Sequence, residues 1–384
     1  MKRYGRSGTL AAMLACLVLA ACGDAAERDG ATGTGGTSSA DASVNAVDAS
    51  DAMRRARTAG VPVLAIHGGA GVVRAGLSAE DQAAARAGLE RALLAGHAQL
   101  EGGAPALDAV TAAITVLEDD PAFNAGHGAV FTHEGRNELD ASLMDGRNGN
   151  AGAVAGVQRV RNPILLARAV MERSPHVMLA GAGAEAFAKG QGIALVDPGY
   201  FRTERRWEQL QRALREEAAD GADAGAALAP VMGPGEGLKY FGTVGAVALD
   251  ADGHLAAGTS TGGMTNKRWG RIGDAPIIGA GTWADARCAV SGTGWGEFYI
   301  RTAAAHEVCA RVRHGGESIA AAGEAVINGE VVAAGGNGGA IALDAAGNVA
   351  FPFNTEGMYR GWIGADGVPH VAVFADEVLV LPGE

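Results

Sequence analysis

Positive charge is scarce in this chain. Its 31 Lys and Arg residues are outnumbered by 43 Asp and Glu residues, which gives a formal net charge of -12 at pH 7. Because a protein that holds nucleic acid needs clustered positive charge, this balance argues against a nucleic-acid partner. The densest basic run, residues 202–206, lies among acidic residues and is typical of a solvated helix face.

Long hydrophobic runs are also missing. The apolar run Leu10–Leu19 is too short for a comfortable transmembrane helix, which needs about 20 apolar residues. It follows the positively charged residues Lys2, Arg3 and Arg6, and it ends in a cluster of small residues. A positive start, a short apolar core and small residues at the end predict an export signal.

The end of this run resembles a bacterial lipobox. Leu19-Ala20-Ala21-Cys22 implies that residues 1–21 are removed as a lipoprotein signal peptide and that Cys22 carries the lipid. Gly23 after the cysteine implies the outer membrane as the destination, with the protein facing the periplasm. The alternative is a secreted or periplasmic protein without lipid, cleaved near Ala21. The resemblance thus implies a lipid anchor to the membrane.

Cysteine is rare as well. Of the four cysteines, Cys16 leaves with the signal and Cys22 is taken by lipid, so Cys288 and Cys309 remain. These two could pair in an oxidising compartment, but pairing depends on geometry that a sequence does not give. Two separate buried thiols are the favoured expectation. The Cys and His spacings do not resemble a zinc site.

Glycine, in contrast, is abundant. The chain of 384 residues contains 60 glycines, which indicates many tight turns, and its 48% hydrophobic content is ordinary for a globular protein. Residues 22–60 contain almost no large apolar side chains, so they are predicted to form a flexible tether. The rest is long enough for one large domain or two small ones.

Hydrophobic patterns from residue 61 onward predict both strands and helices. Residues 61–66 are apolar enough for a first strand, Ser78 opens a capping box and a long helix, and a second helix follows Pro105. The pattern of residues 245–256 recurs at residues 339–350, and each predicts a hairpin with a Gly-containing turn. Such elements favour helices layered on sheets.

The stretch Gly242–Glu297 has the composition of a site. It concentrates hydroxyls and glycines, together with Arg271 and Asp274, on loops that bound short apolar strands. Reactive groups favour loops that a rigid scaffold holds in place. A linker rich in Ala, Gly and Asp, within residues 200–242, directly precedes this stretch and is predicted to be mobile.

The dipeptide Gly242-Thr243 suggests a nucleophile. A threonine hydroxyl needs an adjacent base, and one solution is the residue's own α-amine, with a pKa of about 7.7–8.0. Thr243 would own a free amine only after cleavage of the Gly242–Thr243 bond. Glycine suits such an event because it leaves its carbonyl open to attack by the Thr243 hydroxyl. A threonine at the start of a strand is nevertheless usually just a β-former.

The wider context resembles a known family. Gly-Thr-Val-Gly-Ala-Val-Ala-Leu-Asp at 242–250, Thr-Ser-Thr-Gly-Gly-Met-Thr-Asn-Lys at 259–267 and Gly-Arg-Ile-Gly-Asp-Ala-Pro at 270–276 resemble the plant-type L-asparaginase/isoaspartyl peptidase family. Its members are N-terminal-nucleophile hydrolases that cut themselves into an α and a β chain. The resemblance, which runs from about Val61 to the C-terminus, implies an α chain of residues 61–242 and a β chain of 243–384.

The same resemblance implies the fold and the assembly. The fold class would be α+β, as a four-layer αββα sandwich with two stacked, mostly antiparallel sheets. Two αβ units would pair into a homodimer, (αβ)2. Catalysis would need no cofactor.

The resemblance also implies roles for residues of the motif-rich stretch. Thr243 would attack a side-chain amide carbonyl, with its amine as the base and Thr261 holding its hydroxyl. Arg271 would bind the α-carboxylate of the substrate in a two-pronged contact, which lysine cannot reproduce, and Asp274 would bind the α-ammonium group. The oxyanion would be stabilised by the Thr293 hydroxyl and by Gly294 N–H. Gly294 and Gly296 would also contact the substrate, and Asn124 would lie near the nucleophile as a further catalytic residue.

A structural sodium ion is implied by the resemblance alone. Main-chain carbonyls leave almost no side-chain signature, so the motif match is the only guide to its ligands. The match gives the carbonyl groups of Leu117, Glu118, Asp120, Phe123, Ala125 and His127.

These residues together predict a small-molecule hydrolase. The substrates would be β-aspartyl (isoaspartyl) dipeptides and, less well, L-asparagine. A glycosylasparaginase is the first alternative, although those relatives usually carry Asp where this chain has Gly242. A self-cleaving protease of the same superfamily is a weaker alternative. An inactive surface binding module is the alternative from a different class, and it would not need an intact Thr243.

Overall fold

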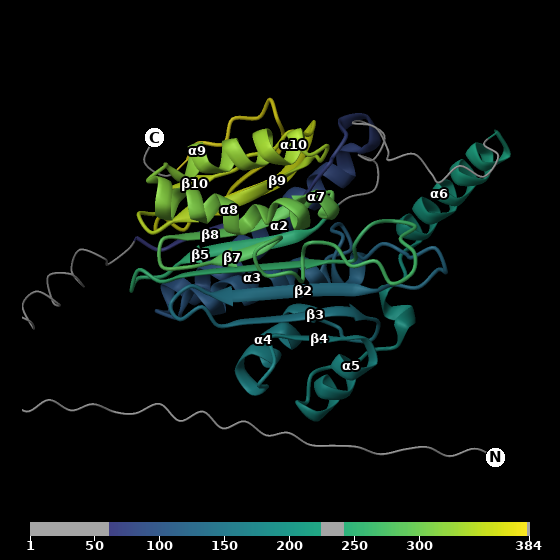
Figure 1. Ribbon diagram of the computed structural model, residues 1–384, viewed down its shortest axis with the longest axis horizontal. Helices are drawn as coiled ribbons and strands as arrows, with labels where there is room; N and C mark the ends of the chain where they lie inside the picture. Colours follow the sequence, from purple (N-terminus) through teal and green to yellow (C-terminus); the bar gives the residue numbers. More distant parts are fainter. Residues whose placement is uncertain (1–60, 224–241, 382–384) are drawn as a thin grey trace, which may run out of the picture. The chain divides into compact units, whose positions relative to one another are not determined.

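Two β-sheets organise the protein. The computed structural model describes residues 61–223 and 242–381 (Figure 1). The larger sheet has the strand order β12-β11-β1-β5-β6-β2-β3-β4, and the smaller one has the order β10-β9-β8-β7. The strands are β1 Val63–Ala70, β2 Leu139–Asp145, β3 Ala151–Val157, β4 Met178–Ala180, β5 Val244–Leu249, β6 Leu255–Thr261, β7 Thr282–Ala284, β8 Cys288–Gly294, β9 Gly338–Asp344, β10 Val349–Ala350, β11 Gly357–Ile363 and β12 His370–Phe374.

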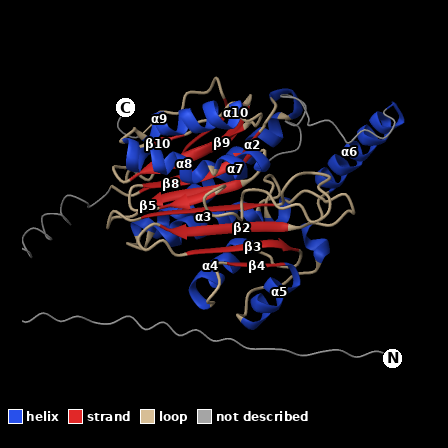
Figure 2. Ribbon diagram, in the orientation of Figure 1, coloured by secondary structure: helices blue, strands red, loops and turns tan. Residues whose placement is uncertain are grey.

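Helices cover the outer faces of both sheets. Against the larger sheet, α2 contacts β1, β11 and β12, while α3 contacts β5 and β6, and α4 contacts β2 and β3. Helices α8 and α9 cover the smaller sheet, as Figure 2 shows with helices in blue and strands in red. The helices are α2 Ala79–Glu101, α3 Ala106–Asp119, α4 Pro163–Arg173, α5 Gly181–Gly190, α6 Glu204–Asp223, α7 Gly296–Thr302, α8 Ala304–Ala310, α9 Ile319–Gly323 and α10 Val331–Ala333.

Alternation along the strands creates three apolar layers. In β1, Leu64 and Ile66 face the helices α2 and α3, whereas Val63 and Ala65 face the smaller sheet. A further core lies between the smaller sheet and its helices. Because the strand pairs of the described residues are antiparallel except β3–β4, the expected α+β sandwich of four αββα layers with mostly antiparallel sheets is confirmed.

Local sequence signals placed several elements correctly. Ser78 Oγ accepts a hydrogen bond of 3.0 Å from Asp81 N, which closes the predicted capping box at the start of α2. Helix α3 begins directly after Pro105. The two predicted hairpins are β5–β6 and β9–β10.

The cysteine prediction is wrong. Cys288 in β8 and Cys309 in α8 are joined by a disulfide, where two separate thiols were expected. Both residues are fully buried, and the bond fastens the outer helical layer to the smaller sheet. With 21 residues of sequence separation, such a crosslink contributes roughly 3 kcal/mol to the free energy of unfolding. Sequence gave no distance between the two positions, so pairing could not be decided from it.

Some predictions fall outside the described residues. These are the signal peptide, Cys22, the tether 22–60 and residues 224–241 of the predicted linker. The earlier part of that linker contains α6, which extends to Asp223. Within the described part of the chain, no helix has the length and apolarity needed to cross a membrane.

Candidate active site

Thr243 directly precedes β5, opposite the end of β6. The register of these strands pairs Val244 with Ser260, which places Thr261 beside Thr243. Thr243 Oγ1 donates a hydrogen bond of 3.1 Å to Thr261 Oγ1, and Gly263 N donates one of 3.0 Å to the same oxygen. The hairpin therefore holds the Thr243 hydroxyl in a fixed position.

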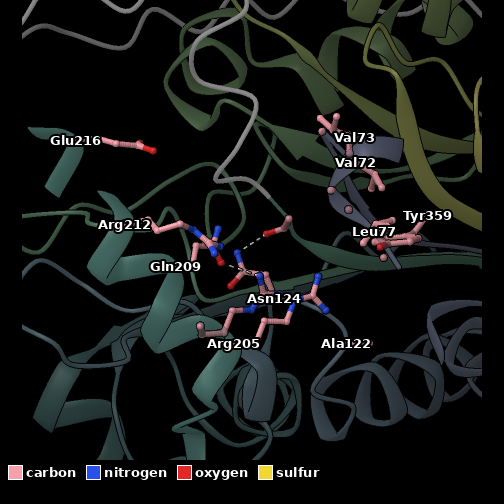
Figure 3. A pocket seen from close by; sticks show the side chains of 17 residues that line it. Val72, Val73, Leu77, Ala122, Asn124, Arg205, Gln209, Arg212, Glu216 and Tyr359 are labelled. Carbon is pink, nitrogen blue, oxygen red and sulfur yellow. Dashed lines mark hydrogen bonds between the residues drawn. The ribbon is translucent and has the colours of Figure 1, made fainter. Parts of the chain in front are cut away.

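Two donors meet the carbonyl group of Gly242. Asn124 Nδ2 lies 2.7 Å from Gly242 O (Figure 3). Thr261 Oγ1 lies 3.2 Å from the same oxygen. The Asn124 amide is itself held in place, because Nδ2 also donates to Gly263 O and Oδ1 accepts from Val130 N. Donors aimed at a carbonyl oxygen stabilise the negative charge that develops there during attack. This geometry suits cleavage of the Gly242–Thr243 bond.

The second half of β1 contacts the backbone of Thr243 and Gly242, a role that the sequence did not reveal. His67 Nδ1 donates to Thr243 O at 2.9 Å, and Nε2 accepts from Ser291 Oγ at 2.9 Å. Desolvation by burial lowers the pKa of His67 to about 3, so the ring is neutral and this pattern of bonds fixes its tautomer. A Cβ on Gly69 would lie 2.8 Å from Gly242 Cα, so this close approach requires glycine.

A small cleft extends from Thr243 and contains most of the predicted substrate-binding residues. Its lining includes Thr243, Thr261, Arg271, Asp274 and Gly294. The structure therefore brings together residues that are separated by up to about fifty positions in the sequence.

Arg271 and Asp274 form the charged end of this cleft. Arg271 donates through Nε and Nη2 to the two carboxylate oxygens of Glu297, each at 2.8 Å. The sequence motifs do not indicate this pairing. Burial raises the pKa of Asp274 to about 7, and the nearby Arg271 opposes this rise. Asp274 Oδ2 is buried without a hydrogen-bond partner in the described structure. A Cβ on Gly296 would lie 2.7 Å from Asp274 Oδ1 and 2.9 Å from Arg271 Nη2, so only glycine fits against this pair.

The two predicted oxyanion groups differ in position. Gly294, at the end of β8, lines the cleft. The Thr293 side chain is fully buried, and its Oγ1 accepts a hydrogen bond of 3.1 Å from Ala70 N. Because a hydroxyl can accept and donate at once, Thr293 keeps a proton to donate.

The six predicted carbonyl ligands lie in the last turn of α3, which contains Leu117 and Glu118, and in the loop that follows it. Three of them, at Leu117, Asp120 and Ala125, already accept backbone hydrogen bonds within this loop. A carbonyl oxygen has two lone pairs, so it can accept such a bond and still bind a cation. Hard oxygen donors suit a hard cation, so the chemistry of these carbonyl groups is compatible with a sodium ion. Burial raises the pKa of Glu118 to about 8, which leaves that side chain largely uncharged at neutral pH.

The basic run 202–206 is not simply a solvated helix face. Arg206 is only 7% exposed and donates through Nε to Gly128 O at 2.7 Å. Burial lowers its pKa to about 10, so the guanidinium group is still charged at neutral pH. The expectation is therefore wrong for Arg206, because α6 packs this position onto the loop after α3. Arg205, in contrast, is exposed as expected.

Replacement of Asn124 should slow chain cleavage. Asn124→Ala removes the 2.7 Å donor to the Gly242 carbonyl, and loss of one oxyanion donor typically slows a reaction by about 100- to 1000-fold. The rate can be followed by denaturing electrophoresis or intact mass after synthesis. Asn137→Ala is the matched control, because Asn137 bonds to carbonyls of the same loop and not to Gly242. Cleavage of Asn124→Ala at the rate of the unaltered chain would contradict this role.

A threonine at the start of a strand, within a four-layer αββα fold and beside a charged cleft, defines an N-terminal-nucleophile hydrolase. Residues 60–373 match the model of the asparaginase family, and the chain belongs to that family. It is 50% identical to an isoaspartyl peptidase of Escherichia coli (strain K12) over 83% of this chain and 98% of that protein.

Two further relatives come from an animal and an archaeon. An isoaspartyl peptidase/L-asparaginase of Xenopus laevis is 40% identical, over 84% of this chain and 98% of the relative. A plant-type L-asparaginase of Pyrococcus abyssi (strain GE5 / Orsay) is 42% identical, over 76% of this chain and 93% of the relative. The resemblance drawn from the sequence motifs is confirmed.

Proposed function

We propose that this protein is a self-cleaving threonine hydrolase that releases L-aspartate from β-aspartyl dipeptides and, less well, from L-asparagine. One observation carries the proposal. The Thr243 hydroxyl, bonded to Thr261 at 3.1 Å, opens into the cleft that holds Arg271 and Asp274. A nucleophile therefore faces a pair of groups complementary to an amino acid's carboxylate and ammonium.

Self-cleavage would create the free nucleophile. Thr243 Oγ1 attacks the Gly242 carbonyl carbon, while Asn124 and Thr261 stabilise the oxygen. The C–N bond breaks and the nitrogen takes up the proton that the hydroxyl has lost, so an ester joins Gly242 to Oγ1 of Thr243. Water then hydrolyses this ester, leaving a carboxylate on Gly242 and a free amine on Thr243.

Turnover would use the same hydroxyl. The Thr243 amine takes the hydroxyl proton, and Oγ1 attacks the side-chain carbonyl of the substrate. The proton passes to the departing nitrogen as its bond to carbon breaks, and water hydrolyses the aspartyl ester. Arg271 and Asp274 hold the α-carboxylate and α-ammonium groups, and Gly294 N–H with Thr293 stabilises the oxyanion. No cofactor takes part, and a sodium ion bound by carbonyl groups within residues 117–127 would only hold Asn124 in place.

Substrate choice tests this proposal. Purified cleaved protein should release aspartate from β-aspartyl-leucine and not from α-aspartyl-leucine, because only the β-linked isomer presents both α groups to Arg271 and Asp274. Aspartate release is measured by chromatography of the free amino acids. Hydrolysis of N-acetylglucosaminyl-asparagine, with β-aspartyl-leucine untouched, would contradict it in favour of a glycosylasparaginase.

Location and assembly are part of the proposal. The lipobox supports a lipid on Cys22 and the outer membrane, facing the periplasm, as the site of action. Substitution of Cys22 by Ser should then move the protein from the membrane to the soluble fraction.

Two αβ units are proposed to form a homodimer, (αβ)2. The molar mass of the mature protein in solution, measured by light scattering, tests this assembly.

A further inference from the structure

A second cavity borders the scissile carbonyl. Its volume is about 400 Å³, and it is formed between the turn after β1, the loop containing Asn124 and helix α6. Gly242 lines both this cavity and the cleft that contains Thr243, Arg271 and Asp274. If the aspartyl half of a substrate fills that cleft, its other half must leave Thr243 in a different direction. The second cavity offers that space.

One wall of this cavity is cationic. Arg205, Gln209, Arg212 and Glu216 are spaced four, three and four positions apart, so they lie along one face of α6 (Figure 3). Arg206 lies in the same wall and holds the helix on Gly128. Three arginines against one glutamate leave the wall positively charged.

The two outer arginines have weak partners at most. Arg205 faces Asp81 at 3.7 Å, but both side chains are nearly half exposed, and such surface pairs contribute little. Arg205 also lies beside the hydroxyl of Tyr359, which is a neutral partner. Arg212 is exposed and forms no ion pair with another described residue. Both guanidinium groups are therefore available to an anionic ligand.

The opposite wall is apolar. Val72, Val73 and Leu77 line it, and Figure 3 shows Asn124 between them and the side chains of α6. The Tyr359 ring borders this wall, with its hydroxyl beside Arg205. An amino acid with an apolar side chain and a free carboxylate is complementary to these two walls. This is the chemistry of the amino acid that a β-aspartyl dipeptide releases.

We propose that the cavity is a leaving-group site, in which Arg205 and Arg212 bind the terminal carboxylate of the dipeptide and the apolar wall receives its side chain. This inference rests on the proposed function and adds the preference for the leaving group. L-asparagine releases ammonia, which has neither group, so the site favours dipeptides over L-asparagine.

A pair of substrates tests the site without any substitution. β-Aspartyl-leucine and β-aspartyl-leucinamide differ only in the terminal carboxylate. Because hydrogen bonds to a charged group are about twice as strong as neutral ones, kcat/KM should be about 10-fold higher for the dipeptide than for its amide. Equal values would overturn the role of the arginines.

Variants of α6 test whether its arginines cause the difference in kcat/KM between the dipeptide and its amide. Arg205→Ala combined with Arg212→Ala should reduce the dipeptide-to-amide ratio to about one, mainly by raising KM for the dipeptide. The ratio of kcat/KM between β-aspartyl-leucine and L-asparagine should fall by about 10-fold for the same reason. Arg215→Ala, also exposed on α6 but outside the cavity, is the matched control.

The outcomes separate this inference from the proposed function. Intact mass first establishes that each variant is cleaved. An unaltered protein that hydrolyses neither β-aspartyl-leucine nor L-asparagine would refute the function itself. A protein that hydrolyses both, with ratios unchanged in the double variant, would leave the function standing and refute the leaving-group site.

Discussion

Thr243→Ala should leave the chain uncut at the Gly242–Thr243 bond and abolish hydrolysis of β-aspartyl dipeptides. The substitution removes the hydroxyl that attacks both the Gly242 carbonyl and the substrate. Loss of a nucleophile in a hydrolase of this kind typically lowers kcat by about 10⁴-fold or more. Intact mass under denaturing conditions would give one chain for this variant and two chains for the unaltered protein, one ending at Gly242 and the other beginning at Thr243.

The control for this experiment is Thr243→Ser, which keeps the hydroxyl and the α-amine and should still produce two chains, at a reduced rate. Thr243→Ala also removes the hydrogen bond to Thr261, but the strand pairing of β5 and β6 does not depend on it. A single chain that persists in the unaltered protein after long incubation would contradict the enzyme proposal. The inactive binding module would then be the better description.

Sequence predicted what is local in this protein. The hairpin β5–β6 could be inferred from its apolar strands and glycine turn, and its pairing alone brings Thr261 next to Thr243. The capping box at Ser78 and the proline at the start of α3 have equally local causes. The family resemblance assigned Arg271 and Asp274 to one substrate, and both line the cleft that contains Thr243.

Contacts between distant segments could not be predicted in the same way. His67 bonds to Thr243 across 176 positions and to Ser291 across 224, and the local pattern around it indicates only a turn. The disulfide depends on the packing of α8 on β8. Arg206 looked solvated because its neighbours in sequence are charged, whereas its burial is decided by the loop against which α6 packs.

The electrostatic environment of buried carboxyl groups also could not be predicted from the sequence. From the sequence, Asp274 is expected to be an ordinary carboxylate, and Glu118 is expected to act only through its main-chain carbonyl group. Burial raises the pKa of Asp274 to about 7 and that of Glu118 to about 8. Composition does not determine burial, so neither shift has a sequence signature. For Asp274 the shift has a direct consequence for catalysis.

Asp274→Asn should lower kcat/KM for β-aspartyl-leucine by about 100- to 1000-fold, because the substrate ammonium group would enter a buried site without its counter-charge. The pH profile should change as well. Only the carboxylate form of Asp274 attracts the ammonium group, and only the neutral form of the Thr243 amine accepts a proton. For the unaltered protein, log kcat/KM should therefore fall below about pH 7 with a slope that approaches two.

In Asp274→Asn, only the protonation of the Thr243 amine should lower log kcat/KM as the pH falls, so the slope on the acidic side of the profile should approach one. Asp252→Asn is the matched control, since Asp252 is exposed in the turn after β5, at the end of that strand away from Thr243. Its profile should coincide with that of the unaltered protein. If Asp274→Asn kept both the rate and the slope of two, Asp274 could not be the group that binds the ammonium. The α-ammonium of the substrate would then have to be recognised elsewhere in the cleft.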